Sequence, residues 1–267
     1  MLAGAVQMTS GGDLAANLDK ARELVTEGAA RGAKLIVLPE NFAFLGEDER
    51  GKFQVAEPIP GDGPILTAMR ELARTLAVDL VLGGMPEAQS PTHVHNSSVY
   101  VDAGGEIRGI YRKIHLFDVA IPDGATFTES ASVRPGEQPI VIDAGHGKVG
   151  LTICYDLRFP ELYRALTHQG ARILTVPAAF TLHTGRDHWH ALLRARAIEN
   201  LAFVIAAAQF GRHNPKRVTY GHACIIDPWG HILAEVGDHE GVAVAELDFE
   251  YQERLRRELP ALDHRRL

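Results

Sequence analysis

The chain has 267 residues, of which 46% are hydrophobic and 23% are charged, an ordinary composition for a globular protein with a large core. Its formal net charge of −7 argues against a surface that binds nucleic acid. No apolar run approaches the roughly 20 residues that cross a membrane as a helix. Because only Cys154 and Cys224 are present and no basic leader opens the chain, we expect a cytoplasmic protein without a disulfide framework.

The first half of the chain alternates predicted strands with amphipathic helices. Apolar residues recur at helical spacing after Asp13, up to Gly32, and again from Pro64 to about Ala77. Gly104 and Gly105 are typical of a hairpin turn. The strands expected in this half cover residues 3–8, 34–38, 80–85, 97–101 and 106–111.

The second half continues this alternation. Helices are expected over residues 159–170, 186–199 and 251–258. Strands are expected over residues 147–154, 173–176, 202–208, 223–226, 232–235 and 242–247. Strands that alternate with helices, and hairpins that interrupt them, predict an α/β fold with a mixed sheet. No linker composition divides the chain, so we expect one continuous domain over residues 1–267.

Cys154 is the candidate nucleophile. It follows an apolar strand and precedes a helix, and a side chain at such a turn lies exposed at the end of a sheet with backbone N–H groups beside it. The alternative is a buried core cysteine, because free cysteines are among the most buried residues. For Cys224, which lies within a strand without polar neighbours, we favour that alternative.

Three charged residues are candidates for the same chemistry. Lys113 would place an ammonium near the thiol, favour its thiolate and stabilise an oxyanion, unless it is a solvated charge. Glu40 ends a buried strand and would be a general base, unless it caps a helix or forms a structural ion pair. Glu129 is a second acid on a predicted loop, where a surface role is the alternative.

Competing motifs predict neither a cofactor nor a metal ion. Residues 145–150 match G-x-G-x-x-G in letters but precede a strand, so the helix N-terminus that binds phosphate is missing. His93 and His95 share a strand face, whereas His188 and His190 do not share a helix face. Neither pair has a third ligand at the usual metal spacing.

With these segments in place, the chain resembles the nitrilase (carbon–nitrogen hydrolase) superfamily over essentially its whole length. At the nucleophile this chain reads Cys-Tyr-Asp, as in the amidase branches, where true nitrilases typically carry Cys-Trp-Glu. The matching segments are Gln7 and residues 38–40, 112–113, 127–130, 154–161 and 194–200.

The resemblance implies a four-layer α-β-β-α sandwich and a catalytic triad of Glu40, Lys113 and Cys154. It implies that Glu129 positions the lysine and the substrate. The Tyr155 backbone N–H would then hold the oxyanion together with Lys113. It also implies a homodimer or a larger homo-oligomer that forms across the helical faces.

Two amidase branches come close, and each implies a different linear amide as the substrate. Residues 111–119 and 126–130 resemble omega-amidase, which acts on 2-oxoglutaramate or 2-oxosuccinamate. Residues 206–230 resemble deaminated-glutathione amidase, and we favour this branch because the match is longer. The substrate carboxylates would then meet Arg158, Lys216 and Arg217, unless these are surface charges or ion pairs. A non-catalytic interaction protein of the same fold is the alternative to an enzyme.

Overall fold

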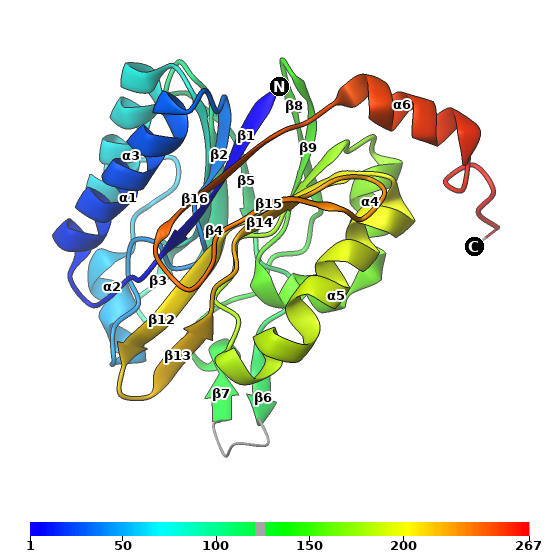
Figure 1. The fold of residues 1–267 in the computed structure, drawn as a ribbon. Helices are drawn as coiled ribbons and strands as arrows, with labels where there is room; N and C mark the ends of the chain where they lie inside the picture. Colours follow the sequence, from blue (N-terminus) through cyan, green and yellow to red (C-terminus); the bar gives the residue numbers. More distant parts are fainter. Residues whose placement is uncertain (121–125, 267) are drawn as a thin grey trace.

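The computed structural model describes residues 1–120 and 126–266, with only the backbone at residue 49. Two sheets pack face to face between two layers of helices (Figure 1). Helices α1 (Leu14–Ala30) and α3 (Pro64–Leu76) cover one sheet, and α4 (Pro160–His168) and α5 (Leu182–Asn200) cover the other. The expected α-β-β-α sandwich is therefore confirmed.

The larger sheet has eight strands in the order β13-β12-β1-β2-β3-β4-β5, with β16 also paired to β1. Strands β1, β2 and β3 run parallel, and β3, β4 and β5 form an antiparallel meander. The strands are β1 (Leu2–Met8), β2 (Leu35–Val37), β3 (Asp79–Ser90), β4 (His93–Val101), β5 (Ile107–Arg112), β12 (Ala208–Asn214), β13 (Arg217–Tyr220) and β16 (Gly241–Glu246).

The smaller sheet has six strands in the order β15-β14-β11-β10-β9-β8, in which β9, β10 and β11 are parallel. Its strands are β8 (Ile140–Ala144), β9 (Gly147–Leu151), β10 (Ile173–Thr175), β11 (Phe203–Ala206), β14 (Cys224–Ile226) and β15 (Ile232–Glu235). The remaining elements are the short η1 (Glu49–Gly51), α2 (Lys52–Val55), η2 (Glu129–Ala131) and η3 (Cys154–Arg158), the hairpin of β6 (Asp118–Ala120) and β7 (Thr126–Thr128), and the terminal helix α6 (Phe249–Glu258).

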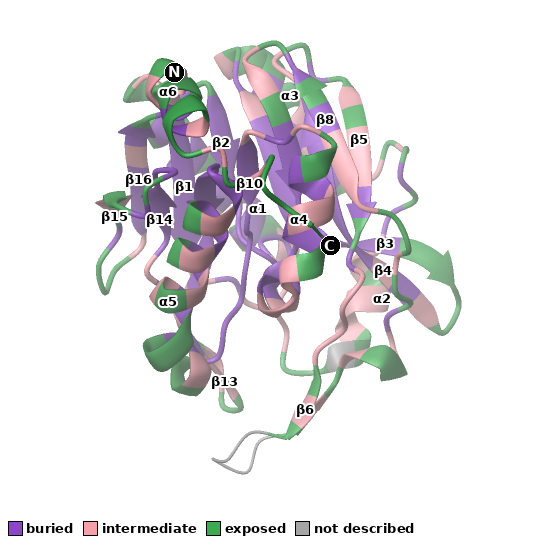
Figure 2. Ribbon diagram, turned by 90° about the vertical axis from the view of Figure 1, so that its right-hand side faces the viewer, coloured by how far each residue is buried: buried purple, intermediate pink, exposed green. Residues whose placement is uncertain are grey.

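Local sequence explains where the helices begin and how the strands are buried. The Asp13 carboxylate accepts a hydrogen bond from the Ala16 N–H at 3.1 Å and caps α1, because the first N–H groups of a helix lack partners. In β2, Leu35 packs between the sheets whereas Ile36 packs under the α1–α3 layer. Both faces of the central strands are therefore covered, and Figure 2 shows these strands as buried.

Three expectations about the strands need correction. Residues 202–208 form two strands, since β11 joins the smaller sheet and β12 joins the larger one. The strand expected over residues 147–154 ends at Leu151, and Cys154 opens η3. Residues 212–220, for which no strand was expected, belong to the β12–β13 hairpin. In the first two cases an apolar run continues past the point where the backbone turns, and burial alone does not mark such a turn.

Candidate active site

Cys154 is held in a strained turn just beyond β9. Its backbone has φ of +48°, in the left-handed region that residues other than glycine seldom adopt. The Cys154 N–H donates to the Pro177 carbonyl at 2.8 Å, and the Ile153 N–H donates to the Asp156 carboxylate at 2.8 Å. Strain of this kind persists where the surroundings fix the backbone, and it concentrates at functional sites.

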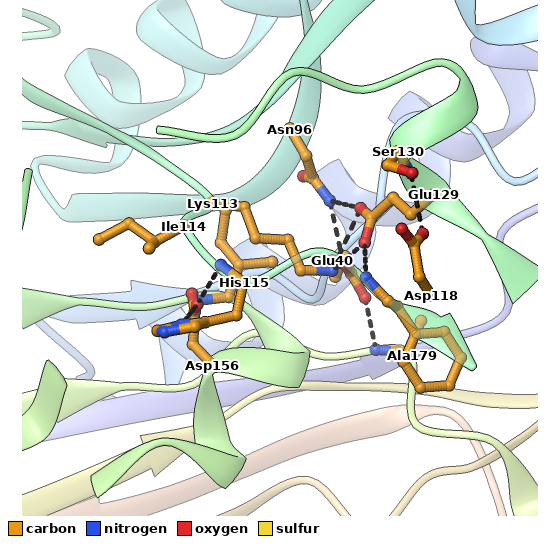
Figure 3. A network of polar contacts seen from close by, with 12 residues as sticks. Glu40, Asn96, Lys113, Ile114, His115, Asp118, Glu129, Ser130, Asp156 and Ala179 are labelled. Atoms are coloured by element: carbon orange, nitrogen blue, oxygen red, sulfur yellow. Dashed lines mark hydrogen bonds and ion pairs between the residues drawn. The ribbon is translucent and has the colours of Figure 1, made fainter. Parts of the chain in front are cut away.

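Glu40 follows β2 and is 3% exposed. Its Oε1 accepts hydrogen bonds from Lys113 Nζ at 2.9 Å and from Asn96 Nδ2 at 3.0 Å. Its Oε2 accepts from the Ala179 N–H at 3.1 Å (Figure 3). The ends of β2, β5 and β10 therefore meet at one buried carboxylate.

Lys113 lies between two carboxylates and is 2% exposed. Besides Glu40, its Nζ contacts Glu129 Oε2 at 2.9 Å and Glu129 Oε1 at 3.2 Å (Figure 3). Glu129 opens η2 and is held in turn by the Phe117 N–H at 2.7 Å and by Asn96 Nδ2 at 3.1 Å. Neither Lys113 nor Glu129 is the solvated surface charge that the sequence left open.

Burial and neighbouring charges decide the protonation of these groups. Burial opposes ionisation of Glu40, but Lys113 and a hydrogen bond from the Cys154 thiol outweigh it and hold the pKa of this carboxyl below its ordinary value. Burial also opposes the charge of Lys113, yet Glu129 and Glu40 raise its pKa well above the ordinary value. Burial and the charge of Glu40 raise the pKa of the Cys154 thiol well above its usual range.

The resting site therefore holds an ionised Glu40, an ammonium at Lys113 and a neutral thiol. This differs from the expectation that Lys113 favours the thiolate. The lysine does act in that direction, but burial and Glu40 prevail. A neutral thiol needs a base when it reacts, and its neighbouring carboxylate is ionised.

All eight residues expected at the site line one cavity of about 580 Å³. The cavity lies where the ends of β2 and β5 meet the turn after β9. Tyr155 is the second residue of η3, and the first N–H groups of such a helix lack partners within it. The predicted residues that line the cavity are Glu40, Lys113, Glu129, Cys154, Tyr155, Arg158, Lys216 and Arg217.

The three basic residues that were predicted to bind the substrate carboxylates differ in their surroundings. Arg158 stacks over Phe180, with 5.3 Å between its guanidinium carbon and the ring centre, and Nη1 lies 3.3 Å from His188 Nδ1. Arg217 donates from Nη2 to the Ala179 carbonyl at 2.9 Å, while its Nε is buried without a hydrogen-bond partner. Lys216 is exposed at the β12–β13 turn.

Comparison with known proteins identifies the family. Residues 2–257 match the model of the carbon–nitrogen hydrolase family. The chain belongs to this family. It is 46% identical to deaminated glutathione amidase of Synechocystis, with 99% of this chain and 97% of that protein covered. It is 43% identical to the human deaminated glutathione amidase, with 99% and 82% covered.

Solved structures of other family members have the same fold as this hydrolase. The Caenorhabditis elegans NitFhit protein superimposes with a TM-score of 0.92 at 39% identity, and the match covers 99% of this chain and 65% of that one. Saccharomyces cerevisiae Nit3, a member of the nitrilase superfamily, gives 0.90 at 32% identity, with 100% and 97% covered. This chain is thus a hydrolase of carbon–nitrogen bonds.

Sequence reasoning did not identify two polar residues that hold the hydrolase site together. Asn96 donates from one amide nitrogen to both Glu40 and Glu129, so it ties the two acids together. Asp156 accepts a hydrogen bond from the Tyr111 hydroxyl at 2.7 Å. It also accepts one from the His115 N–H at 3.1 Å (Figure 3). It thereby joins the turn at Cys154 to the segment that carries Lys113. Asp156 stood within a recognised motif, whereas nothing in the local sequence marked Asn96.

Gly84 makes the close approach of these residues feasible. It lies at an irregularity in the pairing of β3 with β4 and has φ of +57°. A Cβ atom there would lie 2.7 Å from Asn96 Oδ1 and 2.9 Å from Glu40 Cγ. Glycine is therefore required, because any side chain would push Glu40 and Asn96 out of place.

The structure shows where the glycine-containing motif at residues 145–150 and the second cysteine, Cys224, lie. Residues 145–150 lie in the β8–β9 hairpin, as expected for a motif that does not open a helix. Cys224 is fully buried within β14. Among the residues that the structure describes, no helix combines the length and the apolar character needed to cross a bilayer.

Proposed function

We propose that this carbon–nitrogen hydrolase, acting as one domain, cleaves deaminated glutathione to 2-oxoglutarate and cysteinylglycine through a thioester on Cys154. The observation that carries the proposal is that the Cys154 thiol, the Glu40 carboxyl and the Lys113 amine line one cavity, with 2.9 Å between Lys113 Nζ and Glu40 Oε1. Relatives with 43–46% identity over nearly the whole chain carry the name deaminated glutathione amidase. A structure of a mutant of the Nesterenkonia amidase, 29% identical to this chain, shows acrylamide added at the active-site cysteine of that protein.

In the acylation step, Glu40 takes the proton of the Cys154 thiol as Sγ attacks the amide carbon. The carbonyl electron pair moves to oxygen, and the oxyanion is stabilised by the Lys113 ammonium and the Tyr155 backbone N–H. When the carbonyl re-forms, the C–N bond breaks. The leaving amine receives the proton that Glu40 took, which leaves a thioester on Cys154.

In the deacylation step, Glu40 takes a proton from water as the water oxygen attacks the thioester carbon. The same two donors hold the second oxyanion. The C–S bond then breaks, the acid leaves, and Glu40 returns its proton to the sulfur. Hydrogen bonds to Glu129 and Asn96 hold Lys113 and Glu40 in position throughout both steps.

The basic residues of the cavity support a substrate with two anionic ends. Deaminated glutathione has a 2-oxo-carboxylate at one end and a dipeptide carboxylate at the other. Arg158 and Arg217 line the cavity near the nucleophile turn, and arginine binds planar carboxylates in a bidentate manner. Lys216 lies at the exposed hairpin turn, so we assign it to the distal carboxylate.

The test compares kcat/KM for deaminated glutathione and for 2-oxoglutaramate, the substrate expected of an omega-amidase. Lys216→Ala should lower kcat/KM for deaminated glutathione by about fivefold, which is the effect expected for the loss of a partly exposed ion pair. It should leave kcat/KM for the shorter amide unchanged. Arg212→Ala is the matched control, since Arg212 is exposed on the same hairpin but does not line the cavity. A preference for 2-oxoglutaramate with no effect of Lys216→Ala would assign the chain to the omega-amidase branch.

A non-catalytic interaction protein of the same fold is the other reading, and pre-steady-state kinetics separates the two. An enzyme that forms a thioester releases amine in a burst equal to its active sites when deacylation is slower than acylation. Absence of both burst and turnover, with every amide tried, would favour the interaction protein.

We also propose that the protein is a homodimer of the cytoplasm. The support for a dimer is a group of exposed apolar side chains on α5 and the β14–β15 hairpin, since large exposed apolar areas mark association surfaces. They include Ile198 at 47%, Trp229 at 49% and Leu233 at 42% exposure. Light scattering at micromolar concentration should give twice the 29.1 kDa chain mass, and a monomer would refute the dimer. The two unpaired cysteines support a reducing compartment.

A further inference from the structure

A second cluster of reactive side chains lies outside the cavity around Cys154. It consists of His190 on α5, His222 between β13 and β14, and Glu235 at the end of β15. One ligand atom of each residue lies within 4.8 Å of the other two. None of the three residues lines the active-site cavity. Figure 1 shows α5 packed over the β14–β15 side of the smaller sheet, which is where the three segments meet.

We propose that His190, His222 and Glu235 bind a divalent transition-metal ion, with Zn²⁺ as the representative of this class. Two imidazoles and one carboxylate suit ions of intermediate softness, whereas Mg²⁺ and Ca²⁺ prefer sites made of oxygen ligands. Three protein ligands leave a coordination position for water. The ion would tie α5 to the β14–β15 hairpin.

The unpartnered nitrogen of His190 supports the proposal most directly. Its Nε2 is buried and makes no hydrogen bond, although it lies only 3.3 Å from Glu235 Oε2. A tetrahedral ion with bonds of about 2.0–2.1 Å separates its ligand atoms by roughly 3.3 Å. The spacing of these two atoms therefore fits two ligands of one ion, and the ion would satisfy a nitrogen that no protein group satisfies.

Both ring nitrogens of His222 face carboxylates. Its Nδ1 lies 2.7 Å from Glu235 Oε1, and its Nε2 lies 3.4 Å from Asp238 Oδ1. A neutral imidazole can donate through only one nitrogen. A cation bound at Nδ1 removes this conflict, because Nε2–H then donates to Asp238, the arrangement in which an outer carboxylate orients a metal-bound histidine.

The surroundings hold the His222 ring in this position before any ion binds. The His222 backbone has φ of +61°, and its carbonyl accepts a hydrogen bond from the Trp189 indole N–H at 2.9 Å. Tyr220 stacks on the His222 ring with 4.4 Å between ring centres. A preorganised ligand loses little conformational entropy when it binds. This cluster departs from the expectation of no metal site, which considered only histidines close together in the sequence.

The experiment titrates Zn²⁺ into the full chain by calorimetry, with Cys154→Ala throughout to remove a competing thiol. We expect one ion per chain. His190→Ala and Glu235→Gln should weaken binding by roughly a hundredfold or more, because even outer-sphere partners contribute 10–100-fold. Asp238→Asn should weaken it by about tenfold. Asp238 is 83% exposed, so this variant keeps the test valid should an inner-ligand variant fail to fold.

His183→Ala is the matched control, because His183 is an exposed histidine of the same helix. It should bind Zn²⁺ as the parent does, and Mg²⁺ should not bind to either protein. Co²⁺ in place of Zn²⁺ should give visible absorption that His190→Ala abolishes. A parent that takes up no Zn²⁺, or a His190→Ala protein that binds as tightly as His183→Ala, would overturn the proposal.

Discussion

Cys154 and Cys224 are both buried and unpaired, but they lie in different surroundings. Burial is the main reason why the pKa of each thiol is raised. Cys154 opens η3 at the wall of the cavity, beside Glu40 and Lys113. Cys224 lies within β14, hydrogen bonded between β11 and β15. Burial alone yields an inert thiol, and reactivity requires a cavity and a base in addition.

Replacement of each cysteine by alanine tests whether the two thiols differ in reactivity. We expect Cys154→Ala to lower kcat by at least about 10⁴-fold, because the nucleophile and its partners act as a unit. Cys224→Ala should retain the parental kcat, since Cys224 is fully buried and does not line the active-site cavity. Steady-state hydrolysis of deaminated glutathione measures both. Normal turnover by Cys154→Ala would end its assignment as the nucleophile.

Glu40→Gln tests whether the carboxylate is the base that separates the two thiols. We expect kcat to fall by about 10³-fold, within the range for loss of a general base. The charge of Glu40 raises the pKa of Cys154, so a neutral amide should lower that pKa. Alkylation of Cys154 by iodoacetamide should then begin at lower pH than in the parent. Parental kcat in Glu40→Gln would exclude this role.

The pH dependence of kcat/KM in the parent protein also tests whether Glu40 is the base. The folded pKa of Glu40 lies below its ordinary value of 4.5, so this carboxyl stays ionised until the pH falls below that value. We expect the acid limb of kcat/KM to lie below pH 4.5, and the stabilising ion pair with Lys113 to be lost over the same range. An acid limb centred near pH 6 would show that another group is the base.

Asn96→Asp should affect the Cys154 thiol indirectly, through the neighbouring carboxyl of Glu40. A third carboxylate beside Glu40 and Glu129 disfavours ionisation of both, so the pKa of Glu40 should rise. We expect kcat/KM at pH 7 to fall by about tenfold, as for loss of a charge-assisted hydrogen bond, and the acid limb to move to higher pH. Parental activity with a parental pH profile would mean that Asn96 does not position the acids.

The smallest expected effect on activity concerns Cys224. Cys224→Ser buries a hydroxyl in an apolar strand and should cost about 1–3 kcal/mol of unfolding free energy, with unchanged activity per folded molecule. Urea unfolding measures the first quantity and active-site titration measures the second. A loss of kcat without loss of stability would mean that Cys224 communicates with the cavity.

Much of the fold followed from the sequence, because periodicity reports burial. The cap at Asp13, the proline that opens α3 at Pro64 and the hairpin at Gly104 are local features, and the structure contains them. The split of residues 202–208 between two sheets was not predicted, because each half is equally buried. The short strands β6, β7, β8 and β13 were also not predicted, since their mixed exposure gives no clear alternation.

By itself, the sequence determined which residues could carry the chemistry, since Glu40, Lys113 and Cys154 each stand in a short motif at the end of an apolar run. Only the tertiary structure decided the protonation of the thiol, because that depends on burial and on charges from other strands. It likewise brought Asn96 to Glu40 across 56 positions, and His190 to Glu235 across the interface of α5 with the smaller sheet. Such pairs have no local signature, because contacts between distant segments depend on how the layers pack.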